Sequence, residues 1–469
     1  MPAIALVVYL ALAGYLIVRD CQRRKSVSAA VWIPTVLLLI LGSRPISLWV
    51  SGGKGFSVEM GNESAANPLD QIFNLSVIVA SYLVASSRGV SWSRIFKANT
   101  AIMLFYLYFA VSIAWSGDPT GSFKRLLKDF SLLFVIGVIA SEKDPLEAMR
   151  AVYVRCAYVL IPLSVVFIKY FPQYSRAYTI GGEVTITGAT TQKNSLGETV
   201  LVFTLFLFWD FFETRRLGPK QRRNRIPWDH VILLIMGMWL LHLSQSKTAL
   251  LCTVAGVFLL ARSGRLARTA MNRAAIVGAL SLPFLLFFSQ EFSSVIAPFI
   301  EALGRDMTFT GRANIWQHVT INTVNPLIGA GYWNFWGGPG GFAISQAMQT
   351  IVPNAHCGYV DMYLDGGVLG LVVLFVMLTS CGFRIVRYLK KSSDADRYLR
   401  MRLAVMVVAI MYNLSESTFA RMGPIWFTTL LMMVDLPMKP AAKRVAMAMR
   451  QNVRLALSEK SSIAARPWN

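Results

Sequence analysis

The polar residues that could do chemistry gather in four short motifs of an otherwise apolar chain. The motifs are Gln192–Gly197, Ser244–Lys247, Thr310–Trp316 and Asn354–Asp361. Arg312 is the best candidate to stabilise negative charge on a leaving group, because a guanidinium binds anionic oxygens strongly. Lys247, Lys193 and Arg305 could support it, and Asn194 is a further binding candidate. His356 could accept the proton of an attacking hydroxyl.

Each candidate also has a structural interpretation. Arg312 could be a helix-start arginine that binds lipid headgroups, and Arg305 a simple surface charge. Lys193 and Lys247 could be interfacial lysines whose ammonium groups reach the headgroup layer. His356 could cap its loop or bond a backbone carbonyl.

Carboxylates near these motifs have several possible partners. Glu416 stands near the outer end of an apolar stretch, where an ionisable group usually faces a cavity or a partner. It could pair with Arg312 or Arg421, orient His356, or form a purely structural ion pair. Asp361 and Asp365 are close enough in sequence to His356 to orient it, and equally could cap the loop.

No His, Cys, Asp or Glu spacing in the chain is typical of a metal site. Asp394 and Asp396 stand in a short basic connection with no domain around them to hold a nucleotide. The five cysteines are scattered and indicate neither a zinc site nor a disulfide framework. We therefore expect no metal and no cofactor.

The composition places these motifs in a membrane protein. Of 469 residues, 55% are hydrophobic and only 15% are charged, against about 25% charged in soluble domains. The mean hydropathy is +0.51. The net charge of +22 comes from lysines and arginines clustered between apolar stretches, which is typical of membrane topology signals rather than of a nucleic-acid-binding face.

Thirteen apolar stretches are candidate membrane spans, each able to cross a hydrocarbon core of about 30 Å as a helix. They lie near 3–18, 29–43, 71–86, 99–115, 129–141, 151–168, 195–212, 229–243, 247–261, 274–289, 366–383, 403–418 and 424–437. We predict an all-α polytopic membrane protein with about 12 or 13 transmembrane helices.

Alternate connections between these spans differ sharply in charge. The set 19–28, 87–98, 142–150, 213–228, 262–273, 384–402 and 438–469 holds 33 of the 46 lysines and arginines. Because these residues resist translocation, this set is predicted to be cytoplasmic. The N-terminus is then outside and the C-terminus inside, and all four motifs fall on the outer face.

The chain divides into four predicted segments. Residues 1–289 form an N-terminal transmembrane bundle, and 366–437 form the C-terminal transmembrane helices. Between them, 290–365 is a large outer loop in which helical spacing at Glu291–Gly304 and Arg312–Val324 predicts short amphipathic helices. Residues 438–469 are a basic cytoplasmic tail. Loops of this length are usually functional.

Taken together, the outer motifs resemble the O-antigen ligase and polymerase superfamily, most closely its exopolysaccharide-polymerase branch. The resemblance is strongest over about 185–420. It is carried by Leu303 to Asp306, Thr310 to Arg312, Ile315-Trp316, Asn325-Pro326 with Gly329 and Gly331, and His356 with Tyr359, Leu364, Gly367 and Gly370. Lys247 stands where this family usually has an arginine.

The resemblance implies an inverting, metal-independent glycosyl transfer at the periplasmic face of the bacterial inner membrane. The implied donor is a glycan on undecaprenyl diphosphate, and the acceptor is a second lipid-linked glycan or, for a ligase, lipid A–core. His356 would assist the acceptor, while Arg312 and Lys247 would hold the diphosphate. Tyr332, Trp333, Phe335 and Trp336 could stack on sugars or form an interfacial aromatic belt.

Four functions stay open at this point, one of them a non-catalytic assembly subunit, which would show the same topology. A polymerase of lipid-linked repeat units is the first, and a ligase that transfers O-antigen to lipid A–core is the second. A transporter or flippase of the same lipids is a different class, but its site would lie at mid-membrane, whereas the polar motifs here gather at one face. Other assembly and export proteins are expected partners, and nucleic acid is not.

Overall fold

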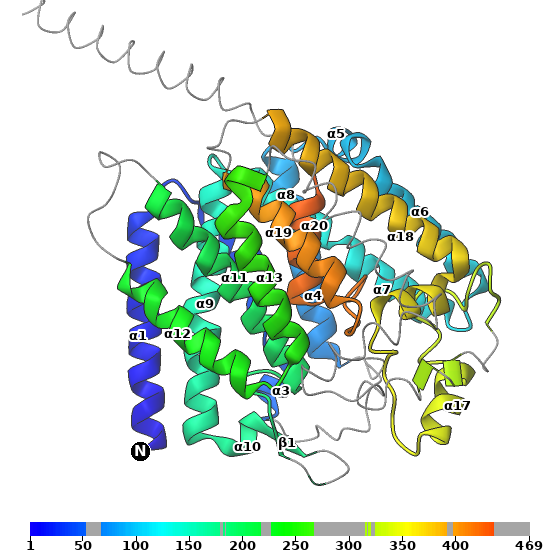
Figure 1. The fold of residues 1–469 in the computed structure, drawn as a ribbon, viewed down its shortest axis with the longest axis horizontal. Helices are drawn as coiled ribbons and strands as arrows, with labels where there is room; N and C mark the ends of the chain where they lie inside the picture. The colour runs from blue at the N-terminus through cyan, green and yellow to red at the C-terminus, as the bar shows by residue number, and fades with distance from the viewer. Residues whose placement is uncertain are drawn as a thin grey trace, which may run out of the picture.

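The structure is a computed structural model that describes residues 1–52, 67–178, 182, 184–216, 227–266, 315–316, 318–319, 324–391 and 397–435. It is built almost entirely of helices packed side by side (Figure 1). Its strands in the described residues are β1 (Arg176–Tyr178) and β2 (Val184–Ile186), an antiparallel pair in which Ala177 is opposite Thr185.

The helices follow the chain in the order the apolar stretches predict. The first half contains α1 (Pro2–Arg23), η1 (Ala29–Val31), α2 (Trp32–Leu41), α3 (Ile46–Val50), α4 (Pro68–Ser87), α5 (Trp92–Ala98), α6 (Thr100–Ser112), η2 (Ile113–Trp115), α7 (Pro119–Phe130), α8 (Leu132–Ala140) and α9 (Pro145–Tyr170). The second half contains α10 (Pro172–Ser175), α11 (Lys193–Arg216), α12 (Trp228–Leu243), α13 (Lys247–Leu266), α17 (Pro339–Ala347), α18 (Gly358–Lys391), α19 (Arg397–Tyr412) and α20 (Pro424–Met433).

Several helices begin at an Asn-Pro or Asp-Pro pair. The side chains of Asn67, Asp118 and Asp144 accept hydrogen bonds from backbone N–H groups of the first turns of α4, α7 and α9. In each case proline follows at the first helical position, where its fixed φ suits the helix and its missing N–H costs nothing. These pairs explain why the helices start where they do.

The all-α polytopic membrane fold predicted from the sequence is confirmed. Within the described ranges, five helices are long and apolar enough to cross a membrane: α1, α4, α9, Lys193–Phe212 of α11 and Gly358–Leu389 of α18. A sixth candidate is the pair α5 and Thr100–Trp115, bent by 96°. Helices also cover the shorter predicted stretches, except 274–289, which lies outside the described residues.

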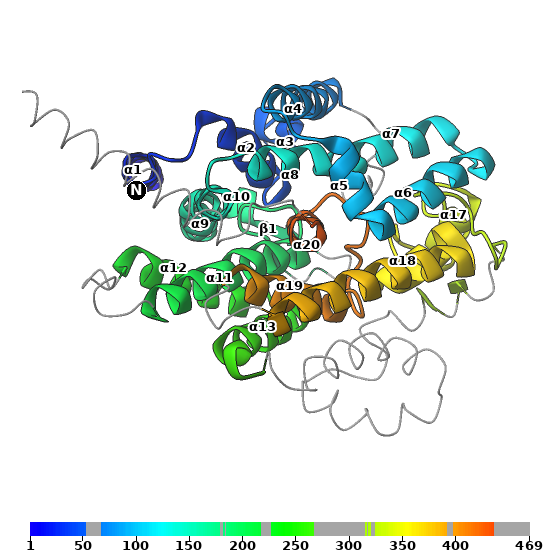
Figure 2. The same ribbon diagram turned by 90° about the horizontal axis from the view of Figure 1, so that it is seen from above.

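Burial separates inner from outer helices. About three quarters of the apolar window of α9 (78%) and of α11 (72%) is buried, against 11% for α1 and 17% for α4. Seen from above, α9 and α20 lie among the other helices while α1 and α4 stand at the rim (Figure 2). In a bilayer the apolar residues of α1 and α4 face lipid tails, so their exposure costs nothing.

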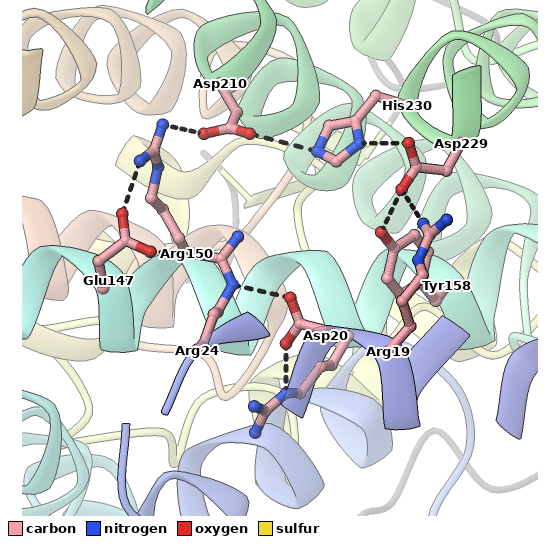
Figure 3. Close-up of polar contacts among 10 residues, drawn as sticks. Arg19, Asp20, Arg24, Glu147, Arg150, Tyr158, Asp210, Asp229 and His230 are labelled. Carbon is pink, nitrogen blue, oxygen red and sulfur yellow. Dashed lines mark hydrogen bonds and ion pairs between the residues drawn. The ribbon is translucent and has the colours of Figure 1, made fainter. Parts of the chain in front are cut away.

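A buried network of charges joins α1, α9, α11 and α12 at one end of the bundle (Figure 3). Asp20 accepts from Arg24 at 2.7 Å and from Arg155 at 2.9 Å. Asp210 pairs with Arg150 and lies 3.2 Å from Nε2 of His230. The network thus brings the predicted cytoplasmic connections 19–28 and 142–150 together with Asp210 and Asp229, the residues on either side of the connection 213–228.

Two separate groups of polar contacts involve further predicted cytoplasmic connections. Glu142 accepts from Ser28 and Arg88, at 2.5 Å in each case. Burial acts to raise the pKa of Glu142, but these bonds and the Arg88 charge hold it below its usual value. Arg384 donates to Asn99 at 3.2 Å and to the carbonyl of Met433 at 2.7 Å.

The opposite end holds the N-terminus, α3, β1 and α17 (Figure 1). There α18 starts at Gly358, eight residues before the predicted span, and is broken at Gly367, where φ is +60°. The segment after Pro326 lies against this break: Ala330 and Gly331 donate to the carbonyls of Leu364 and Asp365, both at 2.9 Å. A Cβ on Gly367 would lie 2.3 Å from Leu327 backbone, so glycine is required.

Candidate functional site

A pocket of about 770 Å³ opens at this end of the bundle. Its wall is formed by the start of α11, the turn between α12 and α13, and the loop that leads into α18. Four of the residues singled out from the sequence line it: Lys193, Asn194, Lys247 and His356. Segments more than 150 residues apart in the chain therefore meet where the sequence motifs predicted a site.

His356 contacts an acidic partner behind the pocket. Its Nδ1 lies 3.7 Å from Oε2 of Glu416, and Nδ2 of Asn194 donates to the same oxygen at 3.1 Å. The imidazole is 30% exposed, whereas the Glu416 side chain is 8% exposed. Of the two described candidates for a partner of Glu416, His356 is the one that approaches it, because Arg421 pairs instead with Asp361 at 2.8 Å.

The loop around His356 is held tightly. The His356 backbone has φ of +49°, an uncommon conformation for a residue with a side chain, and its N–H donates to Oδ1 of Asn354 at 2.9 Å. Gly358 donates to the carbonyls of Asn413 and Glu416 at 2.9 and 3.0 Å. A Cβ on Gly358 would lie 2.1 Å from Oδ1 of Asn413, so only glycine lets the Glu416 turn approach this closely.

Lys193 and Asn194 occupy the first turn of α11, and a buried arginine fixes the loop before it. Arg44 donates to the carbonyls of Thr190 at 3.1 Å and Gly188 at 3.4 Å. Burial lowers the pKa of the Arg44 guanidinium from its usual value, yet a guanidinium starts so high that it stays charged. The result is a rigid approach to the pocket.

Lys247 is positioned by the tight turn between α12 and α13, at the first residue of α13. Gly197 of α11 packs on this turn, where a Cβ would lie only 2.7 Å from Cβ of Ser246. Thr248 and Ser415 share a hydrogen bond of 2.7 Å between their hydroxyls. The turn that carries Lys247 is therefore fixed both to α11 and to the turn that carries Glu416.

The electrostatics of the pocket favour an anion. Two helices, α11 and α13, begin at its wall with Lys193 and Lys247, and a helix N-terminus carries a partial positive charge and free N–H groups. Among the described residues that line it, no Asp or Glu is present. Nor does any described carboxylate form an ion pair with either lysine, and both ammonium groups therefore remain available.

Arg312 and Arg305 lie outside the described residues. The first described residues after Arg312 in the sequence are Ile315 and Trp316. Ile315 lines the pocket, and Nε1 of Trp316 donates to the carbonyl of Ala355 at 2.9 Å. The segment just after Arg312 therefore contacts the residue just before His356.

Other candidates have structural roles instead. Asp361 accepts from the Ala355 N–H at 2.9 Å and from Trp336 Nε1 at 2.8 Å, and so caps the loop rather than orienting His356. Asp365 accepts from the Phe335 N–H at 3.4 Å. Trp333 donates to the carbonyl of Ala420 at 2.8 Å. The aromatic cluster 332–336 thus packs and bonds within the protein, away from the pocket.

Two exposed polar residues of the pocket were not singled out as site residues from the sequence. His242, in the last turn of α12, and Gln245, in the following turn, both line it and are exposed. Their proximity to Lys247 was the available signal. His242 lies within an apolar stretch and therefore ranked below His356, and a glutamine in a turn is not distinctive by residue type alone.

Comparison with known proteins supports the resemblance seen in the motifs. Residues 230–375 match the family model described as O-antigen ligase, and this range includes Lys247 and His356. The exopolysaccharide production protein ExoQ of Rhizobium meliloti (strain 1021) is 23% identical over 306 residues, which cover 63% of this chain and 67% of that protein. The predicted resemblance is confirmed.

Proposed function

We propose that this chain, which is similar to the O-antigen ligase and polymerase superfamily, is a membrane glycosyltransferase that joins undecaprenyl-diphosphate-linked repeat units. In this proposal the reaction takes place at the periplasmic face of the bacterial inner membrane and inverts the anomeric carbon. The name of the similar protein, which refers to exopolysaccharide production, favours a polymerase over a ligase.

One observation carries the proposal: a single pocket combines a histidine, two helix N-termini and two lysines that form no ion pair with a described carboxylate. A transfer from a diphosphate needs both kinds of group. The leaving diphosphate gains negative charge as its bond to the sugar breaks, and the cationic wall stabilises that charge. Arg312, from outside the described residues, is proposed to add to this wall.

His356 is proposed to act on the acceptor. As an acceptor hydroxyl attacks the anomeric carbon, a new C–O bond forms and the bond to the diphosphate oxygen breaks. The hydroxyl proton passes to Nε2 of His356, since Nδ1 faces Glu416 at 3.7 Å. Glu416 then stabilises the imidazolium, and Asn194 holds Glu416 in place at 3.1 Å. A positioned base typically contributes about 10²- to 10⁴-fold.

The test is to incubate the purified protein with undecaprenyl-diphosphate oligosaccharide alone. A ladder of longer lipid-linked glycans supports the polymerase, and His356→Ala should abolish it while the protein keeps its elution profile and thermal midpoint. Product that forms only after lipid A–core is added would identify a ligase instead. Absence of product with either acceptor would refute the transferase.

A further inference from the structure

Gln245 occupies a backbone position that usually belongs to glycine. It directly follows Ser244, the residue that caps the C-terminus of α12, and its φ is +52°. Helices commonly end with a left-handed residue here, and glycine is preferred because it has no Cβ. The turn itself closes through backbone bonds, from Ser244 to Leu240 at 2.8 Å and from Gln245 to His242 at 3.2 Å.

The fold makes no visible use of the glutamine side chain. Gln245 is exposed, and no side chain or backbone group among the described residues forms a hydrogen bond with its side-chain amide. The side chain lines the pocket together with Lys193, Lys247 and His356. A carboxamide offers two donors and an acceptor, which suits the hydroxyl groups of a sugar.

The position relative to Lys247 indicates which part of a substrate the amide would meet. Gln245 stands two residues before Lys247 on the same rigid turn. If the Lys247 ammonium holds the diphosphate, the next group within reach is the sugar attached to it. An amide discriminates between sugars by the direction of their hydroxyls and carries no charge that would compete for the diphosphate.

We infer that Gln245 is a specificity-determining residue that hydrogen-bonds a hydroxyl of the sugar next to the diphosphate. The inference rests on the proposed function and adds a residue for sugar recognition to it. Gln245 then contributes to the binding of the glycan portion and not to that of the lipid diphosphate.

The chain offers a matched control in Gln349. This glutamine follows Met348, the C-cap of α17, has φ of +50° and is exposed, but it does not line the pocket. Replacement by glycine removes the same side chain from the same backbone conformation at both positions. Neither change should lower the thermal midpoint, because glycine suits this conformation.

The experiment measures binding in the His356→Ala background, where no transfer consumes the ligand. Undecaprenyl-diphosphate oligosaccharide and undecaprenyl diphosphate are titrated separately. Gln245→Gly should weaken binding of the first roughly 2- to 10-fold, the range for one neutral hydrogen bond, and change the second less than about twofold. Gln349→Gly should change neither.

The outcomes separate the inference from the proposed function. The parent protein is the His356→Ala variant. If it binds both lipids and Gln245→Gly does not change its binding of the oligosaccharide-bearing lipid, the inference is wrong while the proposed function stands. Equal weakening of both lipids would show that Gln245 acts on the diphosphate or on the turn, which also overturns it. If the parent binds neither lipid, the proposed function itself fails.

Discussion

Nδ1 of His356 and Oε2 of Glu416 are 3.7 Å apart, although 60 positions separate these residues in the chain. The distance is longer than a direct hydrogen bond, so the contact is electrostatic when the ring is protonated. It resembles the arrangement in which a carboxylate fixes the orientation of a catalytic imidazole and stabilises its charged form. The other ring nitrogen, Nε2, is then left for the acceptor hydroxyl.

Glu416→Gln should slow the transfer while it preserves the fold. The amide keeps a partner for Asn194 but removes the charge that stabilises the imidazolium. A charge at about 4 Å is worth between roughly 1 and 4 kcal/mol, depending on the local dielectric, which corresponds to about 5-fold to 900-fold in kcat. Single-turnover rates measure this loss. A rate within twofold of the wild type would remove Glu416 from the mechanism.

The two lysines should matter for binding of the diphosphate. Lys193→Gln and Lys247→Gln should each weaken undecaprenyl diphosphate binding about 10- to 100-fold, since a charged hydrogen bond contributes roughly 1.5–3 kcal/mol. Lys247→Arg should keep most of the affinity, because it preserves the charge. Lys169→Gln is the control: Lys169 is an exposed lysine near the end of α9 and does not line the pocket. Equal effects at all three lysines would indicate non-specific attraction to an anionic lipid.

The charge network at the other end should contribute to stability. Asp210→Asn leaves Arg150 and His230 without their shared carboxylate in a buried place. Breaking such a buried pair typically costs about 3–5 kcal/mol, measured as a lower unfolding midpoint in detergent. Asp118→Asn is a suitable comparison, because Asp118 is 54% exposed, lies 3.9 Å from Arg125 and caps α7 in a way that Asn also can. A change of equal size in both variants would contradict the network's role.

The sequence predicted features that depend on neighbouring residues better than features that depend on residues far apart in the chain. Apolar length and basic flanks are local properties, and they located the helices and the end at which the connections gather. The motifs around Lys193, Lys247 and His356 were found because their types are unusual at a membrane face. The sequence did not determine that Glu416 contacts His356, because Arg312 and Arg421 were equally possible partners of this carboxylate.

Other features depended on contacts that local patterns do not contain. The early start of α18 at Gly358 follows from hydrogen bonds to the 413–416 turn. Helix α17 forms across Gly340 and Gly341, which a propensity argument assigns to a loop. Asp361 was a possible partner of His356, but its carboxylate instead binds the Ala355 N–H, Trp336 and Arg421.

Transfer activity should persist in the presence of a chelator and without nucleotide. The stabilising positive charge in the proposed mechanism comes from Lys193, Lys247 and two helix N-termini, and the energy comes from the donor's bond between the sugar and the diphosphate. Ladder formation in EDTA should therefore stay within about twofold of the untreated rate, a change under about 0.5 kcal/mol in the barrier. Loss of product in EDTA, reversed by added Mg²⁺, would show that a metal takes part.

The orientation of the bundle can be tested with the chain's own thiols. Cys21 is exposed and lies at the end of α1 beside the charge network, whereas Cys156, Cys252, Cys357 and Cys381 are buried. If that end faces the cytoplasm, as the 33 clustered cations predict, an impermeant maleimide should label Cys21 only after the membrane is broken. Gln349→Cys in a Cys21→Ser protein should instead react in intact spheroplasts, since Gln349 is an exposed residue next to the pocket-lining Thr350. The reverse pattern would place the pocket in the cytoplasm, where it could not act on a glycan presented outside the cell membrane.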